Sequence, residues 1–166
     1  TRQVRGEGME NHALQKIVEA VVREMGVSSS ITLDVARNLS EQIRKKASDI
    51  GVNAVVAVSD KAGHPILVEC MDKAFIASYD IAVNKAFTVV SLKMSTSALK
   101  PLAQPGGSLY GIQFTNNGRI VIFGGGEPLL NAEGDIIGGL GVSGGTEEQD
   151  TALAEYGKQI FEKGRI

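Results

Sequence analysis

A chain of 166 residues with 43% hydrophobic and 22% charged residues is sized for one globular domain plus short appendages. Its formal net charge of −2 argues against nucleic acid and anionic membrane surfaces as main partners. One cysteine, Cys70, and two histidines, His12 and His64, exclude an intramolecular disulfide and a histidine-rich metal centre within one chain. No apolar run reaches the roughly 20 residues of a membrane helix, and no export signal is evident. We therefore expect a cytoplasmic protein.

The first 30 residues divide into three predicted parts. Residues 1–8 are polar and aperiodic, as in a flexible extension or a tag remnant. Residues 9–26 read as an amphipathic helix, and residues 27–30 as a linker. The apolar stripe of that helix consists of Leu14, Ile17, Val18, Val21, Val22 and Met25. A helix this short is marginal alone, so we expect its stripe to dock on its own domain, a sister subunit or another partner.

Residues 31–164 are predicted to form the main domain. We expect helices over 32–50, 80–99 and 146–161, and strands over 54–58, 66–70, 119–123 and 136–142. The turn at 60–65 makes a hairpin of the first two strands, and Cys70 is expected to be a buried apolar residue ending the second. Pro101, Pro105 and Gly106 predict a loop, whereas Thr146 and Gln149 form a capping box. This order predicts an α+β fold with a mainly antiparallel sheet.

Two glycine-rich clusters are the most distinctive local feature. One is Gly124, Gly125 and Gly126, and the other is Ser143, Gly144 and Gly145, between a strand and a helix. Backbone N–H groups at such a helix N-terminus can bind an anion. The alternative is that the glycines serve bends and tight subunit contacts. A phosphate-binding loop is excluded because no Gly-Lys-Ser/Thr follows.

Lys85 is the candidate functional side chain. It lies among Ala82, Ala86 and Val89, so it points either into a pocket with Asn84 beside it or, as an ordinary lysine, to solvent. A desolvated lysine can pair with a ligand carboxylate, or act as a base or an imine-forming amine. No nucleophile–base–acid triad is recognisable, so Lys85 is the sole catalytic candidate.

The sequence predicts no metal site. Glu69, Asp72 and Asp80 are acidic, but charged residues near helix starts are ordinary. His12 and His64 are the only histidines available as haem ligands. Both lie where solvated histidines are common, one in the first helix and one in a hairpin turn.

Several short motifs together carry a family resemblance. They are Asp60-x-x-Gly63, Asn84-Lys-Ala86, Gln104-Pro-Gly106, Leu109-Tyr-Gly111, Phe123-Gly-Gly-Gly126 and the segment from Gly138 to Asp150. In this order they resemble the GlcG/HbpS family of small domains. That family also occurs as the C-terminal domain of PduO-type proteins and as OrfY-like proteins.

The resemblance implies a profilin-like antiparallel sheet flanked by helices, and a homo-oligomer ranging from dimer to octamer. It also implies haem or cobalamin as a ligand. We expect Asn84, Lys85 and the two glycine clusters to line the pocket. In the haem-binding PduO-type domain the axial ligand is a histidine on the first domain helix. The corresponding position here is near Arg37, and arginine does not ligate iron in ordinary sites.

Residues 9–25 resemble the encapsulation peptides of bacterial microcompartment cargo enzymes. This resemblance implies a shell or cargo protein as a partner of residues 9–26, and a place inside a microcompartment such as that of propanediol utilization. The expected function is an oligomeric accessory ligand-binding protein rather than an enzyme. The alternatives are an enzyme that acts through Lys85 on a pathway aldehyde or hydroxy acid, and a scaffold without ligand.

Overall fold

The computed structural model describes residues 14, 17 and 30–164 of the chain. The predicted extension 1–8, the linker residues 27–29 and most of the predicted helix 9–26 lie outside the described residues. Leu14 and Ile17 are helical, and both side chains are exposed.

A four-stranded antiparallel sheet forms the centre of the molecule. Its strands are β1 (Val55–Asp60), β2 (Pro65–Cys70), β3 (Gly126–Leu130) and β4 (Ile136–Ser143), in the spatial order β2-β1-β4-β3. The predicted hairpin of β1 and β2 is present, β3 and β4 form a second antiparallel pair, and β1 pairs with β4 in the middle. β1 and β4 are almost completely buried because both have neighbouring strands on each side and helices on each face.

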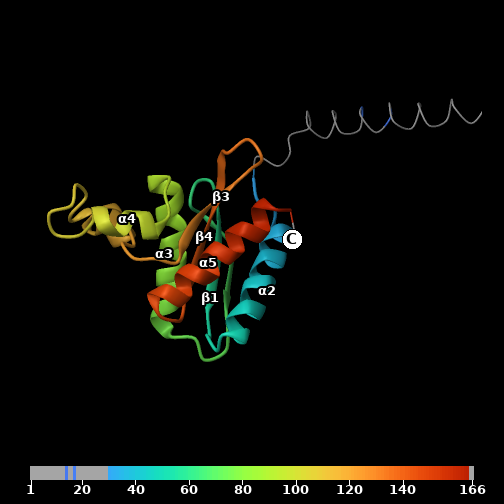
Figure 1. Ribbon diagram of the computed structural model, residues 1–166, viewed down its shortest axis with the longest axis horizontal. Coiled ribbons are helices and arrows are strands. Elements are labelled where there is room, and N and C mark those ends of the chain that lie inside the picture. Colours follow the sequence, from blue (N-terminus) through green and yellow to red (C-terminus); the bar gives the residue numbers. More distant parts are fainter. Residues whose placement is uncertain (1–13, 15–16, 18–29, 165–166) are drawn as a thin grey trace, which may run out of the picture.

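Helices cover both faces of the sheet (Figure 1). The helices are α2 (Leu33–Asp49), α3 (Ile76–Leu92), α4 (Thr96–Leu102) and α5 (Glu147–Glu162). α2 and α5 bury Leu39, Ile43 and Leu153 against one face, whereas α3 alone packs Ala82 and Ala86 on the other. The predicted α+β class, an antiparallel sheet flanked by helices, is therefore confirmed.

Glycines in β4 let α3 approach the sheet closely. A Cβ at Gly141 would overlap the carbonyl oxygen of Ala82, and one at Gly139 would overlap that of Ala86. The helix backbone therefore rests directly on the strand backbone, with no side chain between them. These two glycines serve packing, and neither has a positive φ.

The predicted helix over 80–99 is wrong in its bounds. α3 begins at Ile76 and ends at Leu92, because Lys93 adopts a left-handed conformation with φ of 56°. A second helix, α4, starts after Ser95, whose side chain accepts a hydrogen bond from the N–H of Ala98. This N-cap competes with continuation of α3. Pro101, predicted to lie in a loop, is inside α4.

The predicted strand 119–123 is also wrong. Ile120 and Val121 are buried, as the apolar run indicates, but the N–H of Val121 donates to the Oγ1 of Thr88 on α3 instead of to a strand. The third strand begins only at Gly126. The long connection after α4 carries two short 3₁₀ turns, η1 (Ile112–Phe114) and η2 (Asn116–Gly118), and projects from the body (Figure 1).

Two smaller findings complete the fold. Cys70 is exposed, contrary to prediction, because β2 is an edge strand and Cys70 is its last residue. Among the described residues, no helix combines the length and the apolar character needed to cross a bilayer.

Candidate functional site

Lys85 is completely buried between α3 and the start of α5. Its Nζ donates to the carbonyl oxygen of Val142, at 2.8 Å, and to Oδ2 of Asp150, at 3.1 Å. Of the two directions that the sequence left open for Lys85, the structure shows the inward one, and its charge is met by a carboxylate 65 residues later. Asp150 is the partner that sequence reasoning did not find.

The predicted anion site at the start of α5 is filled by the chain itself. Oδ1 of Asp150 accepts the N–H of Gly145 at 2.9 Å, so the carboxylate joins Lys85 to the glycine turn. Ser143 is buried and its Oγ donates to Oγ of Ser78. A Cβ at Gly144 would overlap the backbone carbonyl of Asn53. The turn is therefore packed on its own backbone and side chains.

Burial shifts both partners of the ion pair. Desolvation lowers the pKa of Lys85, although the charge of Asp150 acts in the opposite direction. Desolvation likewise raises the pKa of Asp150, against the influence of Lys85 and the glycine N–H groups. Burial of two charges carries a large desolvation free energy, so loss of either partner would leave an uncompensated buried charge.

The first glycine cluster closes over the same lysine. Gly125 has φ of 108°, and a Cβ there would lie 2.6 Å from Nζ of Lys85. The N–H of Gly124 donates to Oε1 of Glu147, and the N–H of Gly126 donates to Oγ1 of Thr96, each at 2.9 Å. The structure thus places this cluster against Lys85, as packing that leaves no space for a side chain.

The ring of Phe123 lies beside the buried amine of Lys85. The Nζ of Lys85 lies 5.0 Å from the centroid of the Phe123 ring, and the ring is 38% exposed. A cation over an aromatic face is stabilised by the ring quadrupole.

Asn84 belongs to a different group of side chains. Its Oδ1 accepts from Nε of Arg119 at 3.3 Å, and its Nδ2 donates to Asp80 at 3.1 Å. The guanidinium of Arg119 stacks on Phe87, 3.6 Å from the ring centroid. We call Asn84, Arg119, Phe87 and Asp80 the α3 outer cluster. Asn84 and Lys85 thus diverge, since neighbours on a helix point about 100° apart.

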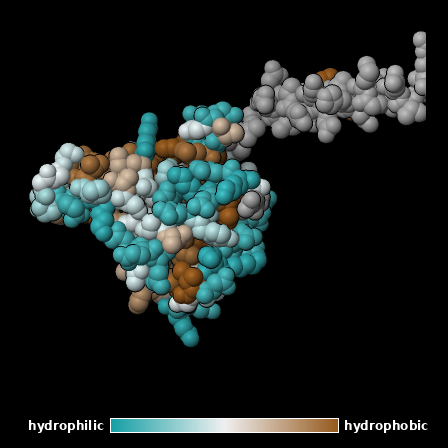
Figure 2. Space-filling view, viewed as in Figure 1, coloured by the Kyte–Doolittle hydropathy of each residue, from teal (hydrophilic) through white to brown (hydrophobic). Residues whose placement is uncertain are grey.

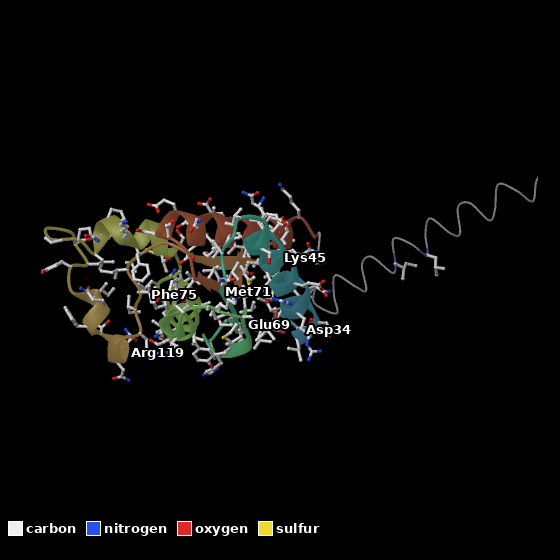
Figure 3. The ribbon with its side chains drawn as sticks, turned by 90° about the horizontal axis from the view of Figure 1, so that it is seen from below. Asp34, Lys45, Glu69, Met71, Phe75 and Arg119 are labelled. Atoms are coloured by element: carbon white, nitrogen blue, oxygen red, sulfur yellow. The ribbon has the colours of Figure 1, made fainter. Side chains whose placement is uncertain are left out.

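Sequence reasoning did not single out Arg119. It begins the run that was predicted to be a strand, where an arginine reads as an ordinary polar flank. Figure 3 places Arg119 and Phe75 toward one end of the molecule, well away from Asp34 and Lys45 on α2. The α3 outer cluster therefore lies apart from the surface of α2.

The remaining candidate ligands are dispersed. His64 is 80% exposed, with Nδ1 3.5 Å from Asp60, and His12 lies outside the described residues. Arg37 is exposed on α2. Glu69 pairs with Ser40 and Arg44. Within the described part of the chain, no three His, Cys, Asp or Glu side chains are grouped to hold a metal ion.

Residues 31–159 match the family model described as haem degrading protein HbpS-like. The crystal structure of Klebsiella pneumoniae ORFY is 46% identical, with a TM-score of 0.76 over 79% of this chain and 90% of that one. The crystal structure of a PduOC–haem complex is 34% identical, with a TM-score of 0.75 over 78% of this chain and 94% of the other.

A longer relative shares the same domain. The corrinoid adenosyltransferase PduO of Citrobacter freundii is 33% identical over 152 residues, which cover 88% of this chain but only 45% of PduO. The family match covers most of the chain, and it includes the sheet, the buried ion pair and both glycine clusters. The chain therefore belongs to the HbpS-like family.

Proposed function

We propose that this chain is an oligomeric accessory protein that binds haem or a corrinoid and works inside a bacterial microcompartment. The similarity to a haem complex of PduOC supports haem, and the similarity to a corrinoid adenosyltransferase supports a corrinoid. Because the chain spans less than half of PduO, adenosyl transfer itself is not part of the proposal.

The described residues do not fit an axial iron ligand at the position implied by the PduO-type domain. That position is near Arg37, whose side chain is exposed and cationic, and His64 lies on a hairpin turn beside Asp60. The Lys85 cluster is closed by its own packing. We therefore derive no step through iron and assign recognition to the periphery of the tetrapyrrole.

The α3 outer cluster suits that task best. The observation that carries the proposal is the Arg119 guanidinium, which is half-buried, stacked on Phe87 and held by Asn84. A fixed guanidinium binds a carboxylate in bidentate fashion, and the Phe87 ring on which it stacks adds apolar surface beside it. Haem and corrinoids combine an extended ring with polar or anionic side groups, which matches this pair of features.

The test is a titration of the purified full chain with haemin and with a cobalamin, followed by visible absorption. We expect Arg119→Ala to weaken binding by roughly tenfold, about 1.4 kcal/mol. Arg37→Ala is the matched control, since it removes an equally charged, exposed side chain from α2. The proposal fails if wild type gives no spectral change with either ligand, or if the two variants weaken binding equally.

Lys85 supports a second candidate, an enzyme that acts on an aldehyde or hydroxy acid. The favouring observation is burial, which lowers the pKa of Lys85 and so favours the neutral amine needed to form an imine. Borohydride trapping with small aldehydes should then give a stable adduct on Lys85. If wild type forms no adduct, or forms adducts only on exposed lysines, then Lys85 has a structural role and the enzyme hypothesis fails.

The compartment part of the proposal rests on residues 9–26. We expect deletion of residues 9–26 to leave the domain folded and to abolish co-purification with compartment shells. Deletion of residues 1–8 is the control and should change neither property. Retained targeting after loss of 9–26 would contradict the proposal.

A further inference from the structure

An apolar groove lies where the described body begins. It is formed by the start of α2, the β3–β4 turn and the end of α5, and its cavity volume is about 290 Å³. Its walls are mainly the side chains of Ile31, Thr32, Val35, Leu130, Ile137 and Phe161. It shares no residue with the Lys85 cluster or the α3 outer cluster, so neither site explains it.

The position of the groove identifies its occupant. Ser30, Ile31 and Thr32 line it, so the segment that precedes Ser30 in the sequence is covalently attached at the groove. Met25 is five residues before Ser30, and a chain of five residues spans at most about 17 Å. The apolar stripe of residues 9–26 is thus tethered within immediate reach of the groove.

The chemistry of the stripe matches the groove. Leu14 and Ile17 are 61% and 59% exposed, so this part of the stripe lacks the cover that an amphipathic helix requires. A cavity of about 150 Å³ lined by aliphatic and aromatic side chains holds a benzene-sized group, so the groove has room for about two aliphatic side chains. Tethering also raises the local concentration of the segment into the millimolar range.

We infer that residues 9–26 dock their apolar stripe into this groove of the same chain. In this arrangement the side chains of Val21 and Met25, which are closest in sequence to Ser30, fill the groove, and the polar face of the segment stays in solvent. The inference goes beyond the proposed function. The stripe cannot bind a shell protein while it lies in the groove, so self-docking holds the targeting segment in reserve until a partner displaces it.

Disulfide trapping in the full chain tests the inference. In a Cys70→Ser background, Val21→Cys on the stripe is combined with Val35→Cys in the groove, and oxidised glutathione is the oxidant. We expect a monomer that loses two hydrogens in mass. The matched control places the cysteine on the opposite face, as Arg23→Cys with Val35→Cys, and should react roughly tenfold more slowly because docking turns it away.

Two results of the disulfide trapping would overturn the inference. Equal rates for the two pairs mean that the tether alone brings the thiols together, and disulfide-linked dimers mean that a second copy occupies the groove. Amide hydrogen exchange tests the same docking without introduced cysteines.

Val35→Asp should speed amide exchange in residues 18–25 several-fold relative to wild type. Leu33→Asp, which lies outside the groove lining, should leave that exchange unchanged. Unchanged exchange in Val35→Asp also contradicts docking. Neither test contains haem, corrinoid or shell, so failure of the proposed function would leave both results intact.

Discussion

At the residue scale, the buried ion pair of Lys85 and Asp150 is the feature whose loss should most affect the stability of the fold. Asp150→Ala should destabilise the fold by about 3–5 kcal/mol, because it strands a buried ammonium group. The double variant Lys85→Met with Asp150→Leu should recover much of that loss, since apolar groups need no partner. Urea unfolding of the three proteins measures both effects. An Asp150→Ala protein within 1 kcal/mol of wild type would show that the pair is dispensable.

This pair also means that substitutions at the predicted pocket would affect folding as well as ligand binding. Lys85→Ala or Gly125→Leu would reduce ligand uptake through damage to the fold, because Gly125 has no space beside Nζ of Lys85. Ligand binding should therefore be tested at positions outside this ion pair, such as the half-buried Arg119.

Glu127 gives a pH-dependent prediction. It is buried on β3 with Lys158 3.2 Å away, and desolvation raises its pKa above the ordinary value of 4.5 in spite of that lysine. The folded state therefore holds the proton more tightly than the unfolded state. Its contribution to stability is full below pH 4.5 and is lost as pH rises through the raised pKa.

The comparison with Glu127→Gln isolates this contribution. The variant cannot ionise, so its stability relative to wild type should increase as pH rises through that window. Unfolding free energies from urea titrations, measured from pH 4 upward, test the trend. A constant difference between the two proteins would show that the carboxyl has an ordinary pKa.

The neighbours Ala82, Ala86 and Val89 left two directions open for Lys85, a pocket or solvent, and the structure shows that it points inward. The sequence did not predict Asp150, because ion pairing across 65 residues follows from how α3 and α5 meet on the sheet. The same holds for Arg119 and Asn84, which are 35 residues apart. Local periodicity indicates which face of a helix a side chain lies on, whereas its partner in a distant segment depends on the topology of the fold.

At the scale of elements, the contact of α3 with β4 is the most sensitive. Gly141→Ala should destabilise the protein by about 1–3 kcal/mol or more, because the added methyl meets the Ala82 carbonyl. Gly134→Asn is the control, since that turn glycine has free space around it and asparagine tolerates its positive φ. Thermal unfolding compares the two, and equal losses would contradict the packing argument.

Elements with strong local signals were predictable. The capping box of Thr146 and Gln149 is present at the start of α5 as predicted. The apolar run 119–123 was misassigned because burial alone does not distinguish a strand from an extended segment bonded to a helix side chain. Ser95 shows the complementary case, in which one N-cap divided a continuous apolar pattern.

At the scale of the molecule, one face of the sheet is covered mainly by α3, with α4 at the edge next to β3. Phe75 and Ile76 at the start of α3 are strongly exposed, with Ile76 at 97%. Figure 2 shows apolar surface on the projecting region around α4 and on the body, interrupted by hydrophilic patches. Apolar surface of this kind marks contact sites, which agrees with the proposed homo-oligomer.

We therefore expect Ile76→Asp to weaken self-association by at least about tenfold, as for a buried interface anchor. Light scattering coupled to size-exclusion chromatography over a dilution series provides the measurement. Ile50→Asp, at the exposed end of α2, is the control and should leave the oligomer unchanged. Identical dilution curves for Ile76→Asp and wild type would place the contact elsewhere.

The bare glycine contact between α3 and β4 has a mechanical consequence. Most helix–sheet contacts contain side chains that change rotamer and absorb small displacements, but here the backbones of Ala82 and Gly141 touch directly. A shift of α3 must therefore move β4 with it, together with the Val142 carbonyl that holds Lys85. A ligand or subunit that displaces α3 from its outer side would thus also displace the Val142 carbonyl that binds the buried lysine.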